Sequence, residues 1–155
     1  MDMMKSELHL NIFSESVKHA IQAMIYLASH RDKPVLVNTI SEYYSIPGFY
    51  LAKIVQILSK HNLVNSIRGR GGGIMLNKPP KKILISDIVV AIEGKKEGKE
   101  MCVYGLDICS DSVPCPIHEN WKIIKPLIKD QLIHQNLEYL SEELLKKHKA
   151  LKVSR

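Results

Sequence analysis

The amino-acid sequence predicts a mainly α-helical fold with one small β-hairpin, from three observations. Residues 14–30 place apolar side chains three and four positions apart, which is the spacing of one buried helical face. Residues 38–60 hold two helical segments separated by Ile46-Pro47-Gly48, which is the helix-turn-helix pattern. Residues 63–76 have the composition of two short strands around a glycine-rich turn, so a small β-wing follows the two helices.

Length and composition indicate one folded unit. The chain has 155 residues, of which 45% are hydrophobic and 25% charged, as in ordinary globular proteins. Lys and Arg outnumber Asp and Glu by 22 to 16, and the net charge of +6 permits a nucleic acid or an anionic surface as partner. No apolar run is long enough to span a bilayer, and the N-terminus lacks the apolar segment of a signal peptide. We therefore expect a cytoplasmic protein with no membrane partner and with reduced thiols.

The helix-turn-helix segment gives the first candidate binding residues. The predicted helix before this motif, residues 14–30, has Ser14 as its predicted N-cap. In the second helix of the motif, residues 49–60, the predicted buried positions are Leu51, Ile54, Val55 and Leu58. The exposed N-terminal half, which enters the major groove of DNA in this motif, then carries Phe49, Tyr50, Ala52, Lys53 and Gln56. On this segment alone, an ordinary pair of packed helices explains the sequence equally well.

The glycine-rich turn distinguishes these alternatives. It carries Arg68 and Arg70 among glycines at positions 69 and 71–73, between two predicted strands. Such a loop can approach a phosphate backbone closely, and its arginines suit a narrow minor groove. A nucleotide-binding Walker loop would instead lie between a strand and a helix and end in Lys-Ser or Lys-Thr. The sequence therefore favours a wing, and with it a winged helix-turn-helix DNA-binding domain over residues 1–83.

Two further segments separate this head from the last part of the chain. Residues 84–101 are predicted to form a short apolar helix, capped by Ser86, and a polar linker. Residues 102–118 contain every cysteine of the chain, Cys102, Cys109 and Cys115, and end in His118.

The cysteine loop has the composition of a metal site. An odd number of cysteines in a reducing compartment argues against a disulfide framework, and no Cys-x2-4-Cys knuckle supports a structural zinc site. The gaps of six and five residues between the cysteines suit the larger iron–sulfur cluster, in which a histidine can replace one thiolate. Zinc stays a weaker option, and three unremarkable surface thiols are the plain alternative.

Residues 119–148 are predicted to be helical, with one long apolar face followed by a C-terminal helix. Pro126 either kinks the long helix or lies in the first turn of its main part, and Asn136 is a plausible break. A small head cannot readily bury so long a face, so a two-fold partner helix is expected and the long helix is a predicted dimerisation helix. Its apolar positions are Trp121, Ile124, Leu127, Ile128 and Leu132, continuing less regularly to Leu137, Leu140 and Leu144.

Taken together, these segments make the chain resemble the IscR/NsrR-type winged helix-turn-helix iron–sulfur regulators, the Rrf-two family. The resemblance covers nearly the whole chain. It rests on the three-cysteine loop and on Phe13-Ser14-Glu15, Ile46-Pro47-x-x-Tyr50-Leu51-x-Lys53-Ile54 and Ser66-Ile67-Arg68-Gly69-x-x-Gly72-Gly73-Ile74-x-Leu76. It implies a homodimeric transcription factor, not an enzyme, that binds a near-palindromic operator in double-stranded DNA. Members that carry a cluster hold it through three cysteines placed like Cys102, Cys109 and Cys115.

The resemblance also suggests individual site residues. His118 matches the histidine ligand of IscR-like members, in the pattern Cys115-x-x-His118-x-x-Trp121. Glu15 matches a carboxylate that NsrR-like members supply from the partner subunit. We favour His118 because it lies three residues from Cys115, and the cluster type, 2Fe-2S or 4Fe-4S, stays open. For DNA, the resemblance implies Tyr50 and Lys53 in the major groove or on its phosphates, and Arg68 and Arg70 in the wing.

The expected mechanism is that the cluster shifts the dimer between arrangements of different operator affinity. Ala52 stands where IscR has a base-reading glutamate, so the operator of that regulator is not expected here. A metal-free thiol redox switch and a zinc-stabilised regulator on the same DNA-binding fold are the alternatives.

Overall fold

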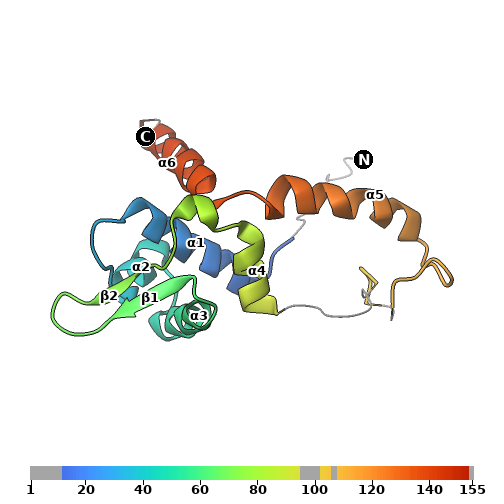
Figure 1. The fold of residues 1–155 in the computed structure, drawn as a ribbon. Coiled ribbons are helices and arrows are strands. Elements are labelled where there is room, and N and C mark those ends of the chain that lie inside the picture. The colour runs from blue at the N-terminus through green and yellow to red at the C-terminus, as the bar shows by residue number, and fades with distance from the viewer. Residues whose placement is uncertain (1–11, 95–101, 106–107, 154–155) are drawn as a thin grey trace, which may run out of the picture.

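The computed structural model describes residues 12–94, 102–105 and 108–153. The described part is mostly helical and contains one antiparallel two-stranded sheet, which confirms the predicted fold class (Figure 1). In chain order the elements are α1 (Glu15–Ser29), α2 (Val37–Tyr44), α3 (Gly48–Lys60), β1 (Val64–Ile67), β2 (Gly73–Leu76), η1 (Pro80–Lys82), α4 (Ile85–Glu93), α5 (His118–Ile128), η2 (Lys129–Ile133) and α6 (Leu137–Val153).

The head of the molecule is built around α1, whose apolar face is buried as predicted. Ser14 caps this helix, since its side-chain oxygen accepts a hydrogen bond from the Val17 amide at 3.3 Å. Helices α2, α3 and α4 pack against α1, and their apolar side chains close one continuous core. Ile88 of α4 is fully buried in this core.

The wing is fixed to the head through the segment that joins α1 to α2. In the hairpin, Val64 pairs with Leu76 and Ile67 with Gly73. Val35 adds a third short pairing: its amide donates to the Ile74 carbonyl at 3.0 Å and its carbonyl accepts from the Ile74 amide at 2.8 Å. Gly73 makes this approach possible, because a Cβ atom there would lie 2.6 Å from the Val35 carbonyl oxygen. The base of the wing is therefore positioned by backbone contact.

Replacing Gly73 by alanine should lower the free energy of unfolding by about 1 to 3 kcal/mol, because it adds a backbone clash to an unfavourable positive φ. Gly71→Ala is the matched control. Gly71 also has a positive φ, but its Cβ would meet nothing within 4 Å. Chemical denaturation of both variants measures the difference, and equal losses of stability would show that the Val35 contact does not position the wing.

The N-cap of helix α4 lies two residues earlier than predicted. Its N-cap is Leu84 rather than Ser86, which lies in the first turn. The Asp87 carboxylate accepts a hydrogen bond from the Leu84 amide at 2.9 Å, so the carboxylate three residues into the helix supplies the capping contact. The short apolar helix itself is confirmed.

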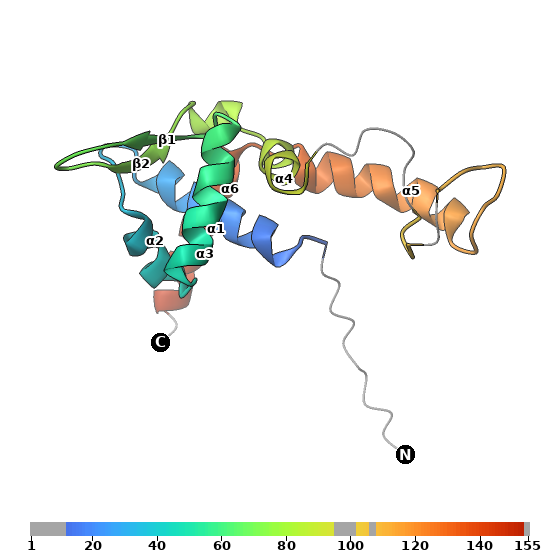
Figure 2. The ribbon, with the colours of Figure 1, turned by 90° about the horizontal axis from the view of Figure 1, so that it is seen from below.

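The C-terminal part divides into two helices with different surroundings. Helix α5 and the cysteine loop lie at the opposite end of the molecule from the wing (Figures 1 and 2). Pro126 lies in the last turn of α5, and a π-helical turn, η2, follows. The chain then turns back, because the Leu137 amide donates to the Ile83 carbonyl at 2.8 Å and the Ile85 amide to the Gln135 carbonyl at 2.9 Å.

This turn corrects the prediction of one continuous apolar face. Leu137 is fully buried in the head core, and Leu140 and Leu144 pack against that core, since α6 lies along α1. These leucines therefore need no partner helix. Helix α5, by contrast, keeps an exposed apolar face, on which Ile123 is 67% exposed and Leu127 is 58% exposed.

Among the helices of the described residues, none combines the length and apolar character that crossing a bilayer requires.

Candidate DNA-reading surface and cysteine loop

Helix α3, the predicted recognition helix, buries the face predicted for it. The predicted face, Leu51, Ile54, Val55 and Leu58, is buried in the head. Figure 2 shows α3 in front of α1, with the wing projecting to one side. Lys53 is exposed on α3, as predicted. The outer surface of α3 and the wing therefore belong to one face of the head.

Tyr50 differs from the exposed position predicted for it. Its hydroxyl lies 2.6 Å from the Ser16 hydroxyl, and its ring meets the His19 ring edge-on at 5.5 Å between centroids. Both contacts are with α1, so Tyr50 is half-buried and holds the N-terminal end of α3 against α1. A role for Tyr50 in binding DNA stays a prediction.

The wing turn presents its two arginines to solvent. Arg68 and Arg70 are both exposed, next to Gly69 and Gly71, which have φ values of 95° and 77°. Only glycine adopts this left-handed region readily, so the sequence can form the tight turn without bulky side chains. The result is a narrow, cationic loop that can lie against a phosphate backbone.

The cysteine loop brings two of the predicted ligands into direct contact. Cys109 Sγ lies 3.2 Å from His118 Nδ1, at the first turn of α5. The His118 amide donates to the Cys115 carbonyl at 3.0 Å, so Cys115 is fixed to the same turn. Cys102 is buried, and Cys109 and Cys115 are partly buried. His118 itself is only 4% exposed, which is unusual for histidine and requires that its ring be hydrogen-bonded.

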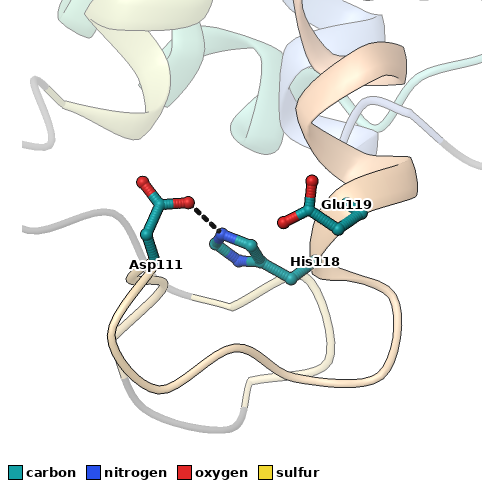
Figure 3. Close-up of side chains that lie close together, drawn as sticks. All are labelled: Asp111, His118 and Glu119. Carbon is teal, nitrogen blue, oxygen red and sulfur yellow. Dashed lines mark hydrogen bonds and ion pairs between the residues drawn. The ribbon is translucent and has the colours of Figure 1, made fainter.

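The second nitrogen of His118 is held by a residue that the sequence did not single out. Asp111 Oδ1 lies 3.0 Å from His118 Nε2 and 2.7 Å from Lys122 Nζ. Figure 3 shows the Asp111 carboxylate facing the imidazole from across the loop. Lys122, and then His118, lower the pKa of Asp111, and Asp111 raises the pKa of Lys122. The sequence could have placed Lys122 near His118, since it lies four residues later on the same helix. No spacing rule indicated that Asp111 would contact either residue.

His118 also belongs to a second group of possible metal ligands. Asp111, His118 and Glu119 have ligand atoms within 4.8 Å of one another, and among the described residues they form a group that could hold a metal ion (Figure 3). The Lys122 ammonium already pairs with Asp111 in this group. A divalent cation would have to displace or tolerate that positive charge. The combination of thiol and imidazole at Cys109 and His118 favours a soft or borderline metal instead.

Glu15, the alternative ligand, is engaged elsewhere in its own chain. Its carboxylate pairs with Lys18 Nζ at 2.6 Å in the first turn of α1, and Lys18 lowers its pKa. A ligand role for Glu15 toward a partner subunit would require this exposed ion pair to open.

The recognition helix, the wing and the loop at the start of α5 define a winged helix-turn-helix transcriptional regulator. A sequence model of the iron-dependent transcriptional regulators named Rrf2 matches residues 13–143. The chain belongs to the Rrf2 family. This agrees with the resemblance found in the sequence.

Individual relatives support the assignment. An HTH-type transcriptional regulator of Aquifex aeolicus is 40% identical over 121 residues, which cover 77% of this chain and 83% of that protein. Among solved structures, CymR, the global cysteine regulator of B. subtilis, is similar with a TM-score of 0.72 and 27% identity, over 86% of this chain and 98% of that one. T. potens IscR is similar with a TM-score of 0.65 and 26% identity, over 88% and 89% of the two chains. The relatives are named as transcriptional regulators and not as enzymes.

Proposed function

We propose that this regulator is a homodimer that binds a near-palindromic DNA operator with an affinity set by an iron–sulfur cluster. The ligands would be Cys102, Cys109, Cys115 and His118, in preference to Glu15. The observation that carries the proposal is the contact between Cys109 Sγ and His118 Nδ1 at 3.2 Å, with the opposite ring nitrogen held by Asp111. We place this regulator in the cytoplasm, where its thiols stay reduced.

The hydrogen bond to Asp111 supports His118 as a ligand. Histidines that bind metals generally donate their other ring N–H to a carboxylate, which fixes the tautomer and the orientation of the ring. A carboxylate can only accept, so the hydrogen bond to Asp111 places a hydrogen on Nε2, and in the neutral ring the lone pair of Nδ1 then faces Cys109. When bound, the cluster would supply a redox-active group that responds to iron supply, oxidants or nitric oxide.

The exposed apolar side chains of α5 support the homodimer. Ile123 and Leu127 are one helical turn apart and largely exposed, and Ile124 beside them is exposed too. A second copy of α5 is the natural cover for such a face, since a two-fold interface pairs identical surfaces. Two recognition helices would then reach half-sites about 34 Å apart, one helical turn of DNA.

The position of His118 explains how a change at the cluster could alter the arrangement of the dimer. His118 is the first residue of α5, so the ligand and the proposed pairing helix share one turn of backbone. A change at the ligand therefore acts directly on the end of the helix that sets the distance between the two heads. The coupling required is modest, about 1 to 3 kcal/mol.

The test compares cluster-loaded and cluster-free protein on one duplex. The operator is first selected from a random DNA library with anaerobically purified protein, whose iron, sulfide and zinc are measured. At fixed salt, the two forms should differ in affinity by about 5- to 150-fold. Equal affinities would refute cluster control, and colourless protein that contains zinc would instead support the zinc-stabilised regulator.

Arg68→Ala should weaken operator binding roughly tenfold while leaving the unfolding transition unchanged, because Arg68 is exposed on the wing. Lys147→Ala is the control, since it removes the same charge from an exposed position on α6. Fluorescence anisotropy at matched ionic strength measures both. Equal effects of the two variants would mean that only net charge matters, and would contradict contact between the wing and DNA.

The same contact favours a metal-free thiol switch as the second candidate. An imidazole 3.2 Å from Cys109 Sγ can stabilise the thiolate, which is the reactive form of cysteine. Hydrogen peroxide would then transfer one oxygen to this thiolate, which becomes a sulfenic acid, and the other oxygen would leave as water after taking up a proton from the solvent. In that case metal-free protein would lose operator affinity on peroxide treatment, and a thiol reductant would restore it.

A further inference from the structure

The outer face of α3 begins with an exposed aromatic ring. Phe49 is 73% exposed, whereas phenylalanine side chains are usually buried in folded proteins. Ala52, Lys53 and Gln56 follow at three, four and seven positions, so they lie on the same face of the helix. Lys53 and Gln56 are exposed, and Ala52 is half-buried. The first turn of this face is therefore apolar, and its second turn is polar and cationic.

The structure separates the roles of the two adjacent aromatic residues. Tyr50 is turned toward α1, where its hydroxyl meets Ser16. Phe49, one position earlier, is directed away from the head. Helix α3 begins at Gly48, which has no side chain, and Pro47 before it is the N-cap residue. Phe49 is thus the first side chain of α3 that can enter a groove.

We propose that Phe49, with Ala52 beside it, reads the C5-methyl group of a thymine in the major groove of each operator half-site. This proposal rests on the proposed binding of an operator by α3. The thymine methyl is the apolar feature that a base pair presents in the major groove, and phenylalanine is among the side chains that contact it. A phenyl ring against the polar edge of guanine or cytosine would instead desolvate hydrogen-bonding atoms without replacing their partners.

The neighbouring charges support a DNA partner for this ring. Lys53 on the same face and Arg68 and Arg70 on the wing are exposed cations, which suit phosphates on either side of a groove. An exposed phenyl ring within a cationic surface therefore fits duplex DNA better than an apolar protein partner.

The test removes single methyl groups from the DNA. In an operator selected from a random library, each thymine is replaced in turn by deoxyuridine, which lacks only the methyl group. For the wild-type protein, one thymine in each half-site should be sensitive, with a loss of about three- to tenfold in affinity. For Phe49→Ala, binding should be weaker and this sensitivity should disappear, because the ring that contacts the methyl is gone.

Gln56→Ala is the matched control, since Gln56 lies on the same exposed face and should leave the methyl sensitivity intact. If the wild type binds the operator but tolerates deoxyuridine at every position, the reading of thymine by Phe49 is wrong while operator binding stands. Persistence of the sensitivity in Phe49→Ala would overturn the proposal equally. Failure of the wild type to bind any duplex would instead refute the proposed function itself. Circular dichroism confirms that each variant is folded.

Discussion

Replacing Ile123 and Leu127 together by glutamate should make the protein monomeric and weaken operator binding by at least about 100-fold, because two linked half-site contacts become two independent ones. Both side chains are largely exposed in the single chain, so the substitutions leave the head core intact. Four carboxylates would then face one another across the proposed two-fold interface, which is strongly unfavourable at short distance. Sedimentation velocity measures the mass, and anisotropy measures the affinity.

Lys129→Glu controls for the change in charge. Lys129 is exposed at the start of η2, and its reversal lowers the net charge by two, as the paired glutamates do. The control should stay dimeric and lose little affinity. A double variant that remains dimeric would show that another surface pairs the subunits, and the geometry proposed for the two recognition helices would then be wrong.

The head was predictable because its signals are local. The apolar spacing of α1 and α3, the Pro47-Gly48 break and the glycine-rich turn each specify backbone conformation within a few residues. Their combination admits few arrangements, and the observed helices and hairpin match the predicted ones. Sequence patterns of this kind fix where an element lies and which face it buries.

The misplaced features depend on contacts between distant segments. Tyr50 turns inward because Ser16, which lies 34 positions earlier, offers its hydroxyl a partner. Leu137 is buried because hydrogen bonds to the segment before α4 turn the chain back onto the head. Periodicity identifies an apolar face but not what covers it. For this reason the apolar positions of α5 and α6 formed one stripe in the sequence and two separate surfaces in the structure.

The loop shows the same limit at the candidate site. Cys109 and His118 were identified from residue type and spacing, and the structure brings them into contact. Asp111 was missed, since an aspartate in a polar loop has no distinguishing pattern before the loop is folded. Its importance follows only from the two distances that link it to His118 and Lys122.

His118→Ala should abolish stable cluster binding, whereas Asp111→Asn should keep the cluster but weaken it by about 10- to 100-fold, as changes to residues that orient metal ligands commonly do. Removing the imidazole removes the proposed fourth ligand next to Cys109. Asparagine keeps an oxygen near Nε2 but loses the negative charge that favours the N–H donor there. Visible absorbance of anaerobically purified protein and the rate of iron loss to a chelator measure the two effects.

Two variants separate a ligand role from general damage to the protein. His134→Ala removes an exposed histidine at the C-terminal end of η2, the helical turn that follows α5, and should retain the cluster. Glu15→Gln tests the alternative ligand and should also retain it, because the Glu15 carboxylate is paired with Lys18. If Glu15→Gln lost the cluster and His118→Ala kept it, the fourth ligand would come from α1. The buried imidazole would then serve only to hold Cys109 and Asp111 in the loop.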